Sequence, residues 1–123
     1  MLTSQQKAHF ETFGFIIRRQ LLSPEEMAAI TREFEDVLNE DRQNKAFAGE
    51  TRHAVSGFAE KRVLLRQLVE DDRIYLPIEQ LLGPDFIWQS SDGNLYVGDT
   101  AWHRDAADLE LNFKRIKVAF YLD

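Results

Sequence analysis

Two side chains late in the sequence have the types and the spacing to bind a metal ion. His103 and Asp105 form a His-x-Asp motif within the run Trp102-His103-Arg104-Asp105. On an extended backbone, residues i and i+2 point to the same face, so the imidazole and the carboxylate would meet at one point. They would supply two ligands of a 2-His-1-carboxylate triad, which binds Fe(II) and leaves positions open. On spacing alone, a surface His and a surface Asp near a turn explain the motif more simply.

Three further motifs, in a fixed order along the chain, favour the metal site. The pattern L-T-x-x-Q-x-x-x-F-x-x-x-G-F covers Leu2 to Phe15, and LSPEEM covers Leu22 to Met27. After the W-H-x-D motif, the run KVAFYLD occupies Lys117 to Asp123. Together these motifs resemble the phytanoyl-CoA dioxygenase family of Fe(II)/2-oxoglutarate oxygenases. The resemblance extends over nearly the whole chain and is vague only between about Asn39 and Arg73.

The resemblance implies how the metal site is divided along the chain. His103 and Asp105 would be the first two iron ligands. In the family, a second His and an Arg that pairs with the 2-oxoglutarate carboxylate lie well downstream of the KVAFYLD strand. His9 and His53, the other histidines of the chain, lie upstream and match neither position. We therefore expect the front half of such an enzyme, inactive on its own.

The reaction that the resemblance implies is hydroxylation of an unactivated C–H bond in a small-molecule or acyl substrate. Asp105 bears on this, because halogenating relatives carry a small residue in its place. The co-substrates would be O2 and 2-oxoglutarate, the latter being converted to succinate and CO2. Nothing in the sequence selects an acyl-CoA over a free small molecule.

Four residues are candidates for binding 2-oxoglutarate. Tyr121 stands eighteen positions after His103, where the family often has an aromatic residue against 2-oxoglutarate, and Thr100 matches a hydroxyl used in some relatives. Gln89 falls on a strand that commonly lines the pocket, and Lys117 shares the strand face of Tyr121 and could bind an anion. An ordinary hydrogen-bonded strand residue explains Tyr121 and Thr100 as well as the binding role does, and explains Gln89 and Lys117 better. Trp102 we expect to pack and orient the motif.

Two other functions fit parts of the sequence. A non-catalytic binding or assembly module of the same fold would explain the missing downstream His and Arg. A cupin-like domain that uses His103 and Asp105 for another metal would leave the N-terminal motif unexplained.

Composition narrows the class of protein. The chain has 123 residues, 44% of them hydrophobic and 29% charged, which suits one packed domain. Its formal net charge of -6 argues against a nucleic-acid or membrane-surface partner, either of which needs basic patches. There is no Cys, so a disulfide framework and a thiolate metal site are excluded. Apolar runs are short and no signal-peptide pattern is present, so we expect a cytoplasmic protein.

The first 84 residues have mainly helical patterns. Thr3 with Gln6, and Ser23 with Glu26, form capping boxes that predict helices to about Phe13 and to about Leu38–Glu40. Residues 15–17 favour a short strand, and residues 41–60 a long loop, in which His53 is either a surface side chain or a substrate contact. Residues 61–82 are helical with a break near residue 71, and Pro77 is expected to start a second helix or turn.

Residues 85–123 have mainly strand patterns. Strands are predicted at 85–91, 94–97 and 115–122, with a hairpin turn at Asp92-Gly93. The fold class is therefore α+β in one domain, residues 1–123, and the resemblance implies part of a double-stranded β-helix, a jelly-roll barrel. Half a barrel would expose strand edges and an apolar face, so we expect pairing into a homodimer or aggregation.

Overall fold

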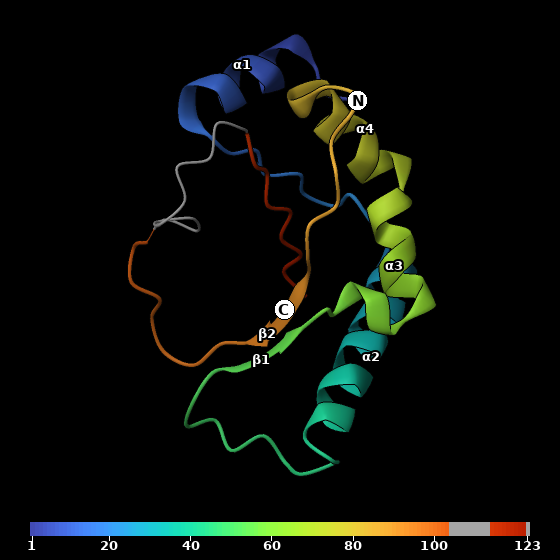
Figure 1. The fold of residues 1–123 in the computed structure, drawn as a ribbon, viewed down its shortest axis with the longest axis vertical. Coiled ribbons are helices and arrows are strands. Elements are labelled where there is room, and N and C mark those ends of the chain that lie inside the picture. The colour runs from blue at the N-terminus through green and yellow to red at the C-terminus, as the bar shows by residue number, and fades with distance from the viewer. Residues whose placement is uncertain (104–113, 123) are drawn as a thin grey trace.

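The computed structural model describes residues 1–103 and 114–122 and is an α+β arrangement. Helices α4, α3 and α2 follow one another down one side of the molecule, with a small sheet beside them and α1 at one end (Figure 1). Within the described residues, the elements are α1 (Ser4–Phe13), α2 (Pro24–Asp41), β1 (His53–Ser56), the 3-10 helix η1 (Ala59–Lys61), α3 (Val63–Glu70), α4 (Asp72–Leu82) and β2 (Asp92–Leu95). No helix of this part is long and apolar enough to cross a lipid bilayer.

Both predicted capping boxes are confirmed. The Thr3 hydroxyl accepts a hydrogen bond from the Gln6 backbone N–H at 3.2 Å, and the Gln6 side chain accepts one from the Thr3 N–H at 2.9 Å. Ser23 and Glu26 make the same reciprocal pair at the start of α2, at 3.2 and 2.7 Å. Four N–H groups at each helix start have no helical partner, and the caps satisfy two of them in each case.

Helix α4 corrects the prediction for Pro77. The helix begins at Asp72 after the N-cap Asp71, and Pro77 lies inside it. Proline has no N–H, so the carbonyl four residues earlier, that of Arg73, loses its helical donor. The Arg18 guanidinium donates to this carbonyl at 2.5 Å and replaces the missing bond. A residue outside the helix therefore allows Pro77 within it.

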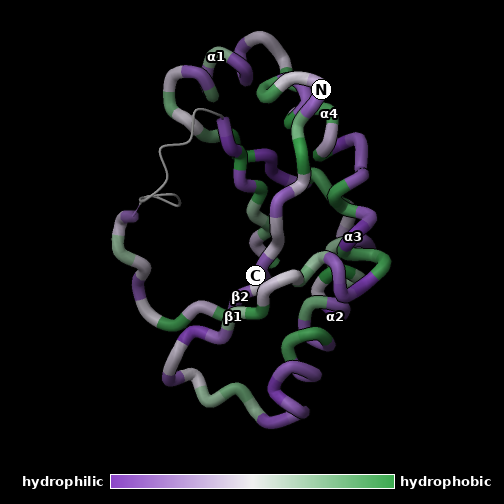
Figure 2. The backbone as a smooth tube through the Cα atoms, viewed as in Figure 1, coloured by the Kyte–Doolittle hydropathy of each residue, from purple (hydrophilic) through white to green (hydrophobic). Residues whose placement is uncertain are grey.

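The core lies between α2, α3 and the sheet. One face of α2 is turned toward it, with Val37 2% and Leu38 1% exposed. Hydrophobic and hydrophilic positions alternate along α2 and α3 in Figure 2, as expected for helices with one buried face. The buried cluster comprises Leu22, Ile30, Val37, Leu38, Val55, Phe58 and Leu65.

The sheet differs from the predicted hairpin. β2 pairs antiparallel with β1, which lies in the segment predicted as a loop, and Val55 is opposite Gly93. Asp92 and Gly93 are therefore strand residues and not a turn. Gly93 is required here for packing, since a Cβ atom on it would lie 2.2 Å from the Phe58 ring. Gly93 is needed because the aromatic ring of Phe58 comes close to its backbone. From the sequence alone, a glycine of this kind in a strand looks the same as a glycine in a turn.

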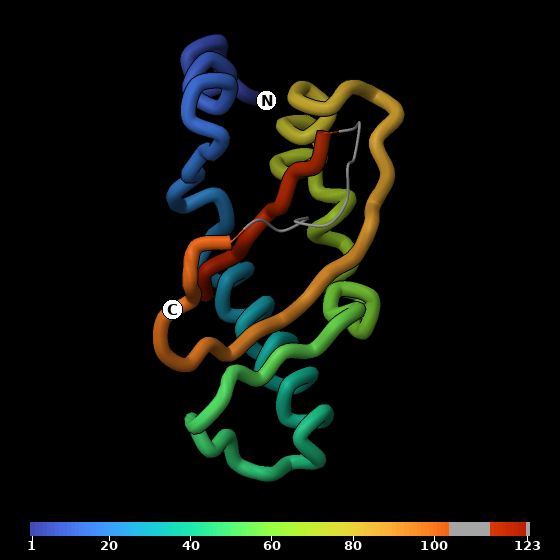
Figure 3. The backbone as a smooth tube through the Cα atoms, turned by 60° about the vertical axis from the view of Figure 1, so that its left-hand side comes forward, coloured from blue at the N-terminus to red at the C-terminus, as the bar shows by residue number. Residues whose placement is uncertain are grey.

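The other predicted strands are not formed. Residues 15–17, 85–91, 96–97 and 114–122 have no regular secondary structure, and residues 85–91 run as a long irregular connection from α4 to β2 (Figure 3). A strand needs a neighbour to satisfy its N–H and C=O groups, and β1–β2 is the one ladder among the described residues. The α+β class is confirmed, whereas the structure does not show a jelly-roll barrel.

Candidate functional site

His103 is the one predicted iron ligand that the structure describes. Its side chain is exposed, and its Nδ1 lies 2.9 Å from the Ala101 carbonyl oxygen. A carbonyl only accepts, so Nδ1 carries a proton, and in a neutral imidazole Nε2 then holds the lone pair. Metal-binding histidines commonly hold one ring nitrogen in such a contact while the other coordinates the metal. The imidazole therefore fits the role of an Nε2 ligand.

Of the other residues in the Trp102–Asp105 motif, the structure describes only Trp102. Asp105 and Arg104 lie outside the described residues. Across residues 1–103 and 114–122, no group of three or more His, Asp or Glu side chains could hold a metal ion. Trp102 is 104% exposed, so the prediction that it packs to orient the motif is wrong.

The four candidate co-substrate residues are all exposed. Gln89 belongs to the irregular connection before β2, and Thr100 to the segment that leads from β2 to His103. Lys117 and Tyr121 lie in residues 114–122, and the Tyr121 side chain is 83% exposed. Their roles in binding 2-oxoglutarate stay predictions.

His53 is neither a loop residue nor fully on the surface. It starts β1, and its side chain is 16% exposed. Nε2 lies 2.8 Å from an Asp41 carboxylate oxygen, and Nδ1 lies 3.0 Å from Nη1 of Arg42. Because a guanidinium only donates, Nδ1 accepts from Arg42, and Nε2–H donates to Asp41. His53 thus connects the end of α2 to the start of the sheet.

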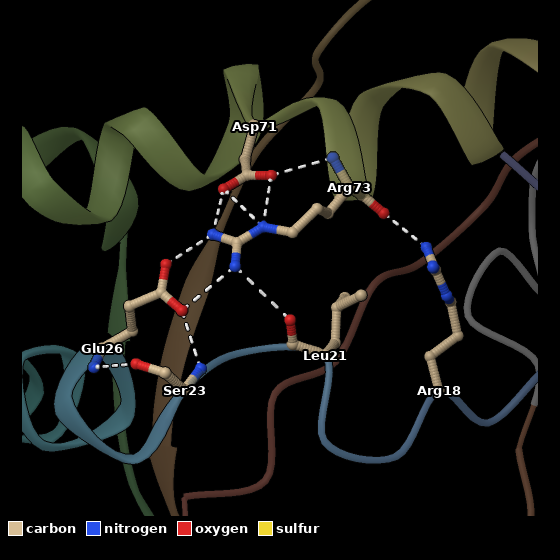
Figure 4. Close-up of polar contacts among 6 residues, drawn as sticks. All are labelled: Arg18, Leu21, Ser23, Glu26, Asp71 and Arg73. Carbon is tan, nitrogen blue, oxygen red and sulfur yellow. Dashed lines mark hydrogen bonds and ion pairs between the residues drawn. The ribbon is translucent and has the colours of Figure 1, made fainter.

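An ionic cluster of Arg73, Glu26 and Asp71 was not foreseen from the sequence (Figure 4). The Arg73 guanidinium donates to both Glu26 oxygens at 2.6 and 3.0 Å, and to Asp71 from Nη2 at 2.6 Å and from Nε at 2.9 Å. It also donates to the Leu21 carbonyl at 3.4 Å. The sequence pointed to only one member of the cluster, Glu26, through its capping box with Ser23. The same Glu26 carboxylate also binds Arg73.

The cluster perturbs the acidity of its members. Hydrogen bonds from Arg73 lower the pKa of Glu26 from 4.5 to about 2, with the Ser23 N–H contributing further. The same guanidinium lowers the pKa of Asp71, and the two carboxylates raise the pKa of Arg73. All three groups are therefore charged across the physiological range. The cluster joins the start of α2 to the α3–α4 junction, which is a structural role.

A second unforeseen cluster fixes the segment before β2. The Glu60 carboxylate accepts from the Ser91 hydroxyl at 2.5 Å and from the Trp88 indole N–H at 2.9 Å. These bonds, that from Ser91 first, lower the pKa of Glu60. The Ser91 hydroxyl oxygen also accepts from the Ala59 N–H at 2.8 Å. The segment next to Gln89 is thus attached to η1 by polar contacts.

A hollow of about 430 Å³ lies between α2 and α3. Apolar side chains such as Ile30 and Leu68 form most of its wall, and the Arg73 cluster borders it. None of the residues predicted for the metal site lines it. A smaller hollow of about 210 Å³ lies in the α2–β1 connection and includes Arg42, Arg52 and His53.

Comparison with known proteins gives one match. The family model described as Phytanoyl-CoA dioxygenase (PhyH) matches residues 10–123, which include the His-x-Asp motif and all four candidate co-substrate residues. No curated protein and no solved structure gives a significant match.

Proposed function

Since the chain belongs to the phytanoyl-CoA dioxygenase family, we propose that it carries the first two metal ligands of an Fe(II)/2-oxoglutarate-dependent hydroxylase. The family match over residues 10–123 is the observation that carries the proposal. His103 would bind Fe(II) through Nε2, and Asp105 through a carboxylate oxygen. The proposal concerns only the part of the metal site that this chain carries.

The contact at His103 supports its proposed role. The Ala101 carbonyl accepts from Nδ1–H, which orients the imidazole and leaves Nε2 as the nitrogen that would coordinate the metal. Asp105 adds the negative charge that stabilises a divalent ion. When bound, iron together with 2-oxoglutarate and O2 supplies the oxidising chemistry that hydroxylates a C–H bond.

The co-substrate contacts complete the proposal. Tyr121 would lie against 2-oxoglutarate, and the Thr100 hydroxyl and the Gln89 amide would donate hydrogen bonds to it. Lys117 would contribute a positive charge near a carboxylate. These four side chains are exposed within the described part of the chain, which keeps them accessible to a small ligand.

Anaerobic Fe(II) binding tests the proposal. We expect binding that is lost in His103→Ala and Asp105→Ala and retained in His9→Ala, because His9 is an exposed residue of α1. A charge-transfer absorption band that appears on adding 2-oxoglutarate would indicate that both ligands assemble on one iron. Equal binding by His103→Ala and His9→Ala would contradict the ligand assignment and favour a non-catalytic module.

We propose further that two copies of the chain associate through the exposed apolar side chains at residues 87–97 and 118–121. Ile87 is 86% and Tyr121 83% exposed, and Trp88 and Tyr96 are both more than half exposed. Side chains of this size bury apolar area when they meet, and the two-stranded sheet adds unpaired strand edges. Size-exclusion chromatography with light scattering should give a dimer that Ile87→Lys shifts toward monomer. A wild-type monomer at high concentration would contradict this.

A further inference from the structure

The Glu60 carboxylate joins the core of the molecule to the irregular connection that carries Gln89. Glu60 belongs to η1, which directly follows the buried Phe58, 6% exposed. Ala59, between these two residues, packs against the hydrophobic core cluster. Burial of the two preceding residues therefore fixes the backbone of Glu60, although its own side chain is exposed.

Both carboxylate oxygens of Glu60 are used, each on a different residue of the connection. Oε2 accepts a hydrogen bond from the Ser91 hydroxyl at 2.5 Å, and Oε1 accepts one from the Trp88 indole N–H at 2.9 Å. An ionised carboxylate accepts stronger hydrogen bonds than a neutral group. One side chain thus holds two points of the connection that lie on either side of Gln89.

The two points are held to different degrees. Ser91 has backbone partners as well, because its carbonyl accepts from the Gly57 N–H at 2.9 Å and its hydroxyl oxygen from the Ala59 N–H at 2.8 Å. For Trp88, Glu60 is the one hydrogen-bond partner among the described residues. Loss of the Glu60 carboxylate would therefore release the connection at Trp88 and leave it attached at Ser91.

Gln89 lies between the two attached positions and makes no such contact itself. Its side chain is exposed and forms no hydrogen bond with a described residue. Because residues 88 and 91 are held, the backbone between them has fewer conformations available. Ordering one side chain on binding costs about two- to tenfold in affinity, so a segment that is already ordered binds a ligand more tightly.

We infer that Glu60 is a positioning residue, which holds the segment of Gln89 for the binding of 2-oxoglutarate. The inference rests on the proposed function, in which the Gln89 amide donates a hydrogen bond to 2-oxoglutarate. Glu60 touches neither the iron nor the co-substrate in this scheme and acts through Trp88. Its loss should therefore lower the affinity for 2-oxoglutarate and leave the affinity for Fe(II) unchanged.

NMR relaxation of the metal-free full chain tests whether Glu60 holds the segment. The backbone N–H groups of residues 87–90 should become more mobile in Glu60→Ala and in Trp88→Phe, which keeps an aromatic ring but removes the indole N–H. Glu70→Ala is the matched control, because Glu70 is exposed at the end of α3 and makes no hydrogen bond or ion pair through its side chain with a described residue. Unchanged mobility in Glu60→Ala would overturn the inference.

Anaerobic titration of the Fe(II)-loaded chain with 2-oxoglutarate tests the role in binding, through the charge-transfer band. Glu60→Ala and Trp88→Phe should bind 2-oxoglutarate about two- to tenfold more weakly than Glu70→Ala. Glu60→Gln keeps one acceptor oxygen and should recover part of the loss. Fe(II) affinity, measured without 2-oxoglutarate, should be the same in all four variants.

The outcomes separate this inference from the proposed function. Equal 2-oxoglutarate affinity in Glu60→Ala and Glu70→Ala would overturn the inference and leave the proposed function in place. A parallel loss of Fe(II) affinity in Glu60→Ala would show a merely structural role and would overturn it as well. A wild-type chain that gives no charge-transfer band would contradict the proposed function, and the role of Glu60 with it.

Discussion

The helical region, residues 3–82, and the segment from residue 85 onward differ in how much apolar surface they bury and in how their backbone N–H and C=O groups are paired. The buried hydrophobic core residues of the described chain lie between Leu22 and Ile74. Among the described residues beyond 84, Leu95 and Leu122 are the hydrophobic residues packed against this core, while Ile87, Trp102 and Tyr121 are mostly exposed. A helix satisfies its backbone within itself, whereas a strand depends on a neighbour, so the helices need little from the later segment, while β1 and β2 depend on each other.

The largest expected effect comes from deleting one core side chain in the helical region. Leu38 is 1% exposed, and Leu38→Ala should lower the free energy of unfolding by about 2–5 kcal/mol through lost burial and a residual cavity. Ile87→Ala removes a similar side chain that is 86% exposed and should change stability by less than about 0.5 kcal/mol. Chemical denaturation of both variants measures the contrast. Comparable losses would mean that the two regions share one core.

Gly93 lies at the junction of the two regions, and adding a methyl group there tests how firmly they meet. A Cβ at Gly93 would come within 2.2–2.6 Å of the buried Phe58 ring, so Gly93→Ala should cost about 1–3 kcal/mol by overpacking. The cost should fall in a Phe58→Leu background, because the smaller side chain leaves room. A double-mutant cycle by denaturant unfolding measures this coupling, and strict additivity would contradict the contact.

The Arg73 cluster predicts a pH dependence confined to the helical region. The pKa of Glu26 is about 2 in the folded chain against an ordinary value of 4.5. A lowered carboxyl pKa stabilises the fold above about pH 4.5, and this contribution disappears as the pH falls toward 2. Glu26→Gln should therefore flatten the loss of stability over that range, and Glu25→Gln should not. Since the pair is partly exposed, salt should weaken the difference.

The sequence predicted the helices better than the strands for a physical reason. Capping boxes at Thr3 and Ser23 and the glycine after α1 are local signals, and all three are present in the structure. The pairing of β1 with β2 joins residues about forty positions apart, and no local pattern marks His53–Ser56 as the partner. The prediction that Pro77 starts a new helix or turn failed for the same reason. Pro77 fits inside α4 because Arg18, which is remote in sequence, donates to the carbonyl that Pro77 leaves without a donor.

In the candidate site, too, local features could be predicted from the sequence and long-range contacts could not. Motif order was sufficient to identify the family and to nominate His103, whose Nδ1 contact involves only the residue two positions before it. The pairs Arg42–His53 and Arg73–Glu26 were missed because charged residues are common and their partners are fixed by tertiary structure. Residue type thus indicated the chemistry, while only the fold revealed which charges are satisfied.

The smallest effect compares two helix caps of the same chemistry. Ser23→Ala removes the hydroxyl that caps α2, whose residues Ile30, Val37 and Leu38 belong to the core, so it should cost about 1 kcal/mol of global stability. Thr3→Ala makes the same change on α1, which has no buried residue. Its loss should appear as faster amide hydrogen exchange within Ser4–Phe13, with little change in the denaturation midpoint. An equal global cost for both variants would show that α1 unfolds together with the core.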